Sequence, residues 1–206
     1  MARMIQVAAL YNARAQAKGW ASYCDSTLSF DHAGFHQLVG LWHALRGDGP
    51  LPPRHALTAR RLKDFLPDLA LYERQEAPDG YRHRCRLMGT RVAQVYGEHT
   101  GKVMEEFLPP RHVERFCASM DDTLAAGVPL RFLARTASAD SDYFSAEYCL
   151  LPLADTLGAA TMVMIGVSFS GMHWDAFLAR MMEQLKAGQT KSFASAERAS
   201  VLNTAM

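Results

Sequence analysis

The chain has 206 residues, 49% of them hydrophobic, and a formal net charge of +1. This length favours one domain with its own hydrophobic core, which buries roughly 70% of the extended-chain surface. The balanced charge argues against bulk binding to nucleic acid, because attraction to a phosphate backbone requires an excess of basic residues.

Cysteine spacing and hydropathy narrow the class of protein further. The four cysteines lie far apart in the sequence and include no C-x-x-C pair, so we expect reduced core thiols rather than a zinc site or a disulfide framework. The apolar run at residues 7–11 is too short for a signal peptide. The later apolar run at residues 159–167 is far below the roughly 20 residues that span a bilayer. We therefore expect a soluble cytoplasmic protein that does not bind a membrane.

The N-terminal quarter of the chain predicts helices. Residues 1–25 are rich in alanine and indicate a weak helix whose packing the sequence does not place. Residues 31–46 carry an apolar stripe at helical spacing that includes Phe35, Leu38 and Trp42. The turn-rich segment at residues 47–53 ends this helix. A second short helix begins after Thr58 and stops at Pro67.

Two strands are expected next, joined as a hairpin. Residues 69–73 form a short apolar strand, and a Pro-Asp-Gly turn follows at residues 78–80. Residues 81–87 alternate strictly, which is the period of a half-buried strand. One face of this strand carries Tyr81, His83, Cys85 and Leu87, and the other carries Arg82, Arg84 and Arg86.

The middle of the chain returns to helical spacing. After Gly89, Val92 and Tyr96 belong to a short helix that ends at Gly97. Pro109 and Pro110 open a longer helix that runs to Gly127, because a proline in the first turn loses no helical hydrogen bond.

The rest of the chain predicts a strand meander and a last helix. Strands are expected at residues 129–136, 143–153 and 160–169, with short antiparallel connections. A terminal helix is expected at residues 174–185, and residues 187–206 lack an apolar stripe and are expected to be disordered. The prediction is an α+β fold, in which one five-stranded antiparallel sheet has helices on one face, with flanking helices at both ends. We divide the chain into an N-terminal helical flank (1–55), a domain (56–171) and a C-terminal segment (172–206).

The segment from residue 89 to residue 110 resembles the PAS domain. Tyr96-Gly97 stands where a PAS helix ends in an aromatic-glycine pair, Gly101-Lys102 follows four residues later, and Phe107-Leu108 precedes the proline-led helix. A narrower resemblance, over about residues 35–170, is to a stand-alone PAS family common in alphaproteobacteria. It rests on Trp42, Leu51-Pro52-Pro53-Arg54, Leu66-Pro67, the Arg84–Thr90 strand end and Leu151-Pro152-Leu153.

The resemblance implies a bacterial sensor with a small cavity between a curved sheet and its middle helices. Inward-facing side chains are the candidate ligand contacts, and plain core packing explains the same residues equally well. These candidates are His83, Cys85, Leu87, Val92, Tyr96, Phe107, Phe116, Phe132, Tyr148 and Leu150.

The sequence leaves the cofactor open. The segment at residues 89–91 does not resemble the cysteine motif of flavin-type light sensors, so covalent flavin chemistry is not expected. A haem-binding PAS domain needs an axial histidine, for which His112 and His99 are the candidates. For His112 a solvent-facing position in the first turn of the helix is the favoured explanation, and no metal site is predicted.

Two classes of function stay open. The first is a regulatory sensor that binds a small molecule and contacts a signalling partner protein, and the second is a ligand-free interaction adaptor. We expect a homodimer formed partly through the helices near Trp42 and Trp174. Catalysis is not expected, because the chain has no H-E-x-x-H, P-loop or G-x-S-x-G motif. Five arginines, at positions 82, 84, 86, 131 and 135, are expected on the outer sheet face, either solvated or as an anion or partner surface.

Overall fold

The computed structural model describes residues 2–78, 80–138, 141–172, 175–183 and 186. The elements are α1 Ala2–Lys18, β1 Ser22–Asp25, α2 Ala33–Arg46, η1 Arg54–Ala56, α3 Ala59–Leu62, η2 Leu66–Asp68, β2 Leu69–Ala77, β3 Gly80–Met88, α4 Thr90–Tyr96, η3 Met104–Glu106, α5 Pro110–Ala126, β4 Leu130–Ser138, β5 Ser141–Ala154 and β6 Ala160–Ser170. Residues 175–183 form a further helix, called here the C-terminal helix. Trp174 and the predicted tail at residues 187–206 lie outside the described residues.

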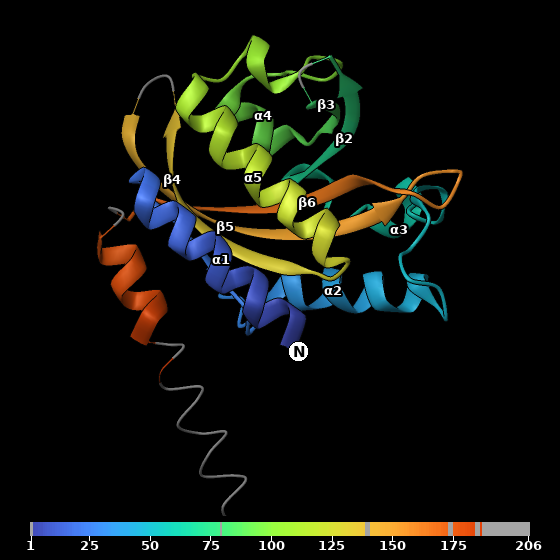
Figure 1. Cartoon of the computed structure of the whole chain (residues 1–206), viewed down its shortest axis with the longest axis horizontal. Coiled ribbons are helices and arrows are strands. Elements are labelled where there is room, and N and C mark those ends of the chain that lie inside the picture. Colours follow the sequence, from blue (N-terminus) through green and yellow to red (C-terminus); the bar gives the residue numbers. More distant parts are fainter. Residues whose placement is uncertain (1, 79, 139–140, 173–174, 184–185, 187–206) are drawn as a thin grey trace, which may run out of the picture.

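The sheet has six antiparallel strands in the order β1-β4-β5-β6-β2-β3 (Figure 1). The prediction of five strands is wrong by one strand. Ser22–Asp25, in the segment expected to be weakly helical, pairs with β4 so that Cys24 lies opposite Phe132. A four-residue strand is too short to show a period, whereas the five predicted strands all exist in the predicted order.

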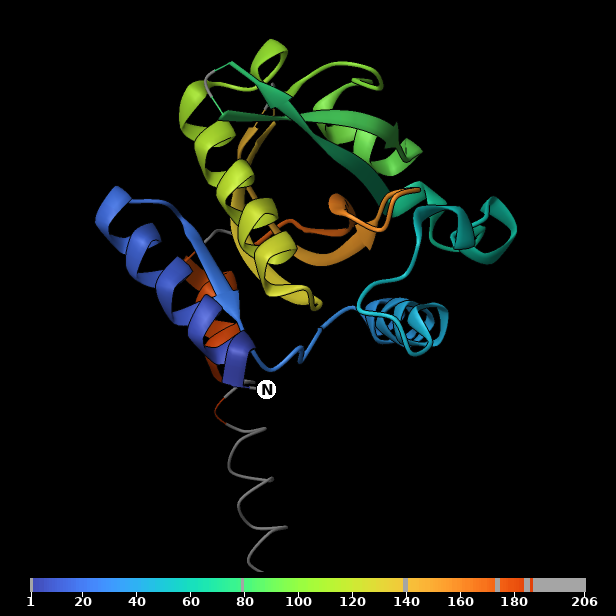
Figure 2. The same cartoon turned by 45° about the vertical axis from the view of Figure 1, so that its right-hand side comes forward.

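Helices cover both faces of the sheet, so the prediction that they lie on one face is wrong. Successive residues of β5 point to opposite faces. Leu150 packs in a core layer with residues of α1, α4 and α5, and we call this side the inner face. Leu151 packs on the outer face with residues of α2 and α3. Figure 2 shows α5 and α2 on opposite sides of the strands.

Close packing fixes α2 on the outer face. Trp42 is fully buried, and its indole Nε1–H donates to the Pro152 carbonyl at 2.7 Å. A Cβ placed on Gly166 of β6 would lie 2.8 Å from the Phe35 ring, so the helix approaches the strand at a position without a side chain. The apolar stripe of α2 therefore covers the chain's own sheet.

A β-bulge changes the direction of one predicted site residue. Leu71 pairs with Leu87 while Tyr72 pairs with Cys85, which leaves Arg86 as an extra residue in β3. After the bulge Leu87 points to the outer face, where it packs with the α2 and α3 cluster. The prediction that Leu87 shares a face with Cys85 is therefore wrong.

Both edge strands have partners at their free sides. The Asn12 side chain of α1 accepts from the Cys24 N–H at 2.7 Å and donates to the Cys24 carbonyl at 2.9 Å. On the opposite edge, the Cys85 N–H donates to the Lys102 carbonyl at 2.9 Å and the Gly101 N–H donates to the Cys85 carbonyl at 2.8 Å.

Within the described ranges, no helix is both long and apolar enough to cross a membrane.

Candidate ligand cavity and buried ion network

A small apolar cavity lies between the inner face of the sheet and the helices α4 and α5. It has a volume of about 30 Å³, which is room for about two water molecules. Strands β2, β5 and β6 supply one wall, and α4, α5 and the segment around η3 supply the other. The lining consists of Ala70, Tyr72, Val92, Tyr96, Met104, Phe107, Leu108, Phe116, Tyr148, Ile165 and Val167.

Two tyrosine hydroxyls meet at this cavity. The hydroxyl of Tyr96, from α4, lies 2.8 Å from that of Tyr148, from β5, at hydrogen-bonding distance. The Phe116 ring of α5 packs edge-on against both tyrosines, with centroid distances of 6.5 Å and 5.9 Å. The site therefore offers an apolar surface with a hydroxyl pair that can donate or accept a hydrogen bond.

A second space, of about 10 Å³, lies on the other side of Phe116. Phe132 and Leu150 line it, together with Tyr11 of α1. Tyr11 is fully buried and packs edge-on against Phe132 at 4.8 Å. The weak amphipathic pattern of α1 gave no sign of this contact, so the contribution of Tyr11 was missed.

The structure brings together seven of the predicted site residues. Five line the cavity, namely Val92, Tyr96, Phe107, Phe116 and Tyr148. Phe132 and Leu150 line the second space. Ile165 and Val167 of β6 were missed, although the alternation in that strand would have indicated them. Contact of any of these residues with a ligand stays a prediction.

The other three candidates lie elsewhere. Leu87 faces outward because of the bulge. Cys85 packs in the inner layer, where burial raises the pKa of its thiol. His83 is 1% exposed, and its Nε2 lies 3.2 Å from the Asp121 carboxylate of α5. Neither Cys85 nor His83 is among the residues that line the two spaces.

A comparison of the sequence with family models identifies the family of this chain. The sequence matches the family model of the PAS domain over residues 30–168, well over half of the chain. The chain belongs to the PAS domain family. The resemblance predicted from the residues between Gly89 and Pro110 is thereby confirmed. This PAS match begins at residue 30, within the segment that the sequence assigned to the N-terminal flank.

Two further comparisons concern individual proteins. A solved structure of an RNA-binding light-oxygen-voltage receptor is similar to this PAS protein at 17% sequence identity, with a TM-score of 0.41. The alignment covers 67% of this chain and 39% of that chain, so the PAS protein spans well under half of the receptor's length. A search of curated proteins finds no match.

Neither histidine considered as a haem ligand lines the PAS cavity. His99 stacks on Phe107 with a centroid distance of 4.0 Å, and its Nε2 lies 2.7 Å from the Tyr96 carbonyl. His112 lies in a separate cleft beside α1. In the part of the chain that the structure describes, no group of three or more His, Cys, Asp or Glu residues is placed to hold a metal ion.

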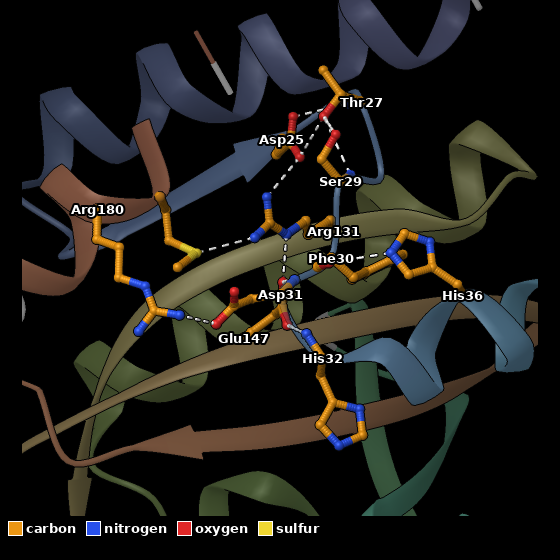
Figure 3. Close-up of polar contacts among 11 residues, drawn as sticks. Asp25, Thr27, Ser29, Phe30, Asp31, His32, His36, Arg131, Glu147 and Arg180 are labelled. Atoms are coloured by element: carbon orange, nitrogen blue, oxygen red, sulfur yellow. Dashed lines mark hydrogen bonds and ion pairs between the residues drawn. The ribbon is translucent and has the colours of Figure 1, made fainter. Parts of the chain in front are cut away.

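The outer face of the PAS sheet contains a buried ion network (Figure 3). Arg131 of β4 is 1% exposed, and it donates from Nε to Glu147 of β5 at 2.7 Å and from Nη1 to Asp25 of β1 at 3.0 Å. The expectation that Arg131 belongs to a solvated or partner-binding surface is therefore wrong. Its two carboxylate partners compensate the buried charge.

The network connects the PAS sheet to both flanking segments. The Glu147 carboxylate also accepts the N–H groups of Asp31 and His32, each at 2.9 Å, just before α2. Arg131 Nη2 lies 3.2 Å from the Met181 sulfur of the C-terminal helix. Arg180 of that helix pairs with Asp31 at 2.5 Å, as Figure 3 also shows. A shift of β4 against β5 would thus act on both flanks.

Proposed function

We propose that this PAS protein is a regulatory sensor that binds a small, mostly apolar molecule beside Tyr96 and Tyr148. The observation that carries the proposal is the apolar cavity with a hydroxyl pair at its wall. Such a lining suits a ligand with an apolar body and one hydrogen-bonding group. The absence of a catalytic motif in the sequence is the reason to propose a sensor rather than an enzyme.

The size of the cavity suggests how a bound ligand would change the conformation of the protein. A ligand larger than about two waters has to displace a side chain of the lining, which includes the rings of Phe116 on α5 and Tyr96 on α4. Occupancy would then favour a different position of one of these helices, which is how a ligand shifts a conformational equilibrium. The ion network around Arg131 offers a path from the sheet to the flanking segments, where we propose that a partner protein binds.

The small volume also favours a second candidate, a ligand-free adaptor. An inner layer that is filled by its own aromatic side chains is stable without a bound ligand. In that case the protein would bind its partner through the surfaces of its helices. A homodimer is one form of this proposal. Because Trp42 is fully buried against its own sheet, a second copy would contact other parts of the helices.

Retention of a small molecule during purification separates the two candidates. Native mass spectrometry of the full chain should show an added mass that organic extraction removes. Tyr148→Ala should weaken retention by at least about tenfold, because it removes both the ring and the hydroxyl from the cavity wall.

Leu87→Ala is the matched control. It also removes apolar surface, from a partly buried side chain on the outer face. Equal loss of ligand in both variants would argue against this cavity as the site. A wild-type protein that carries no added mass after expression in several hosts would favour the adaptor.

A further inference from the structure

A second, larger hollow lies between the end of α1 and the start of α5. Its volume is about 460 Å³, within the range of small-molecule sites. Lys18 and Trp20 line one side, Arg111, His112 and Arg115 line the other, and Arg135 of β4 also lines it. We propose that this hollow, called here the basic cleft, binds a small phosphorylated molecule through Arg115 and Arg111.

The buried guanidinium of Arg115 is the main argument. Arg115 is 5% exposed, donates from Nη1 to the Arg135 carbonyl at 2.8 Å and lies 4.8 Å from the centre of the Phe116 ring. No carboxylate among the described residues forms an ion pair with it. A buried charge is normally compensated by an opposite charge, as Arg131 is by Asp25 and Glu147. The cleft therefore presents a positive charge that has no counter-ion within the described ranges.

The described residues around Arg115 do not supply that counter-ion. Glu114 lines the same cleft, but its carboxylate pairs with Lys18 at 2.9 Å. Arg111 donates from Nε to the His112 ring at 3.3 Å, a contact that requires a neutral imidazole as acceptor. The cleft thus gathers positive charge around a neutral histidine.

Two further observations support an anion at this place. Burial, and after it the positive charges of Arg115, Arg111 and Arg135, lower the pKa of His112 to about 4. The positive end of the dipole of α5, a helix of 17 residues, also lies here. The positive charges of Arg115 and Arg111 and the dipole of α5 act in the same direction, towards binding of negative charge.

Phosphate is the anion that fits this set of donors. Guanidinium groups bind phosphate oxygens through paired N–H donors, and two of them can share a doubly charged group. The cleft volume exceeds that of a bare phosphate, and Trp20 gives it an aromatic side, so we assign a small organic phosphate. Because Arg115 also contacts Phe116, an anion that draws the guanidinium would alter the wall of the apolar cavity.

Titration of the full chain with inorganic pyrophosphate tests the cleft. Calorimetry should detect binding that weakens as salt is raised. Arg115→Met should weaken it by about tenfold or more, and Arg111→Gln by several-fold. Arg60→Gln, which changes an exposed arginine of α3, serves as the control and should leave the affinity unchanged. Equal weakening by Arg60→Gln and Arg111→Gln, or no binding by the wild type, overturns the proposal.

A stability measurement shows whether weaker binding by Arg115→Met results from misfolding of the variant. If the charge of Arg115 lacks a counter-ion, Arg115→Met should keep or raise the melting temperature in phosphate-free buffer. A lower melting temperature together with unchanged pyrophosphate affinity would make Arg115 a structural residue and overturn the assignment. Retained apolar mass and pyrophosphate affinity are measured separately, so failure of the apolar-ligand proposal is distinguishable from failure of this one.

Discussion

At the scale of single residues, the two buried arginines differ in what compensates them. Arg131 lies between Asp25 and Glu147, whereas Arg115 has a carbonyl and an aromatic ring. Burial removes the hydration of each guanidinium. Among the described residues, carboxylates compensate this loss for Arg131 and not for Arg115. We infer that Arg131 serves the fold and Arg115 serves binding.

Arg131→Met should strongly destabilise the protein. It leaves Asp25 and Glu147, which are 2% and 3% exposed, without their shared counter-charge. Breaking a buried pair in this way costs about 3–5 kcal/mol, and urea unfolding measures the loss. Arg91→Met is the control, because Arg91 is exposed and its ion pair with Asp68 should contribute little. Similar losses in the two variants would mean that the network is not the stabilising element described here.

His112 should make the fold sensitive to mild acid. Its pKa is about 4 in the folded protein, chiefly through burial, and about 6.5 in an unfolded chain. Between these values the unfolded state binds more protons, so stability should fall as the pH drops from about 6.5 towards 4 and should be fully present above that window. The groups that surround His112 are Arg111, Arg115, Arg135, Glu114 and Lys18.

The variant His112→Gln isolates this contribution. Urea unfolding at several pH values should give a shallower fall in stability below pH 6.5 for the variant than for the wild type, since other titrating groups are common to both. Identical profiles would mean that His112 titrates normally in the folded state.

At the scale of elements, the start of α4 depends on a glycine for reasons of space. A Cβ on Gly89 would lie 2.1 Å from the Leu66 carbonyl oxygen and 2.5 Å from that of Pro67 in η2. The φ of Gly89 is −70°, which any residue adopts, so the requirement is steric. Backbone atoms cannot move aside as a flexible side chain can.

Gly89→Ala should therefore destabilise the protein by at least about 1–3 kcal/mol. Gly40→Ala is a matched control, because Gly40 lies in the exposed part of α2 with no atom within 4 Å of its added Cβ. That change should stabilise the protein by about 0.5–1 kcal/mol through helix propensity. Thermal unfolding of both variants compares the two effects, and equal shifts would contradict the steric argument.

Most elements were predictable from the sequence, and the errors have physical causes. Alternation and glycine positions located β2 to β6 and the long helix α5, because each is long enough to show its period. The bulge at Arg86 was not visible, since an inserted residue leaves the alternating letters unchanged and only reverses their direction. The four residues of β1 are shorter than any usable pattern.

The candidate site was predictable in part for the same reasons. Tyr148 followed from strand alternation, and Tyr96 and Phe116 followed from helical spacing. The role of Arg131 was not predictable, because Asp25 lies far away in sequence and its side chain reaches the arginine only after β1 pairs with β4. Arg115 was hidden by the covering helix α1, whose position no local pattern encodes.

At the scale of the whole molecule, the segments outside the central domain belong to its core. Tyr11 of α1 and Trp42 of α2 are both fully buried, one on each face of the sheet. Removing either helix would expose a layer of apolar side chains that the sheet cannot cover alone.

The fragment 56–171 should therefore fail to unfold cooperatively. It lacks α1, β1 and α2, and so leaves both sheet faces open, including Phe132 and Leu151. The chain that ends at residue 186 is the control, because it keeps every described contact. Circular dichroism during heating should give a sharp transition for the control and a broad one or none for the fragment. A sharp transition in the fragment would show that the flanks are dispensable.

The contacts that Asn12 makes with β1 have a consequence for assembly. The carboxamide occupies the N–H and carbonyl of Cys24 that would otherwise receive a strand from another molecule. The residues 101–102 occupy the corresponding groups of Cys85 at the far edge. A strand from another molecule would therefore have to displace Asn12 at Cys24, or residues 101–102 at Cys85, before it could pair with these residues.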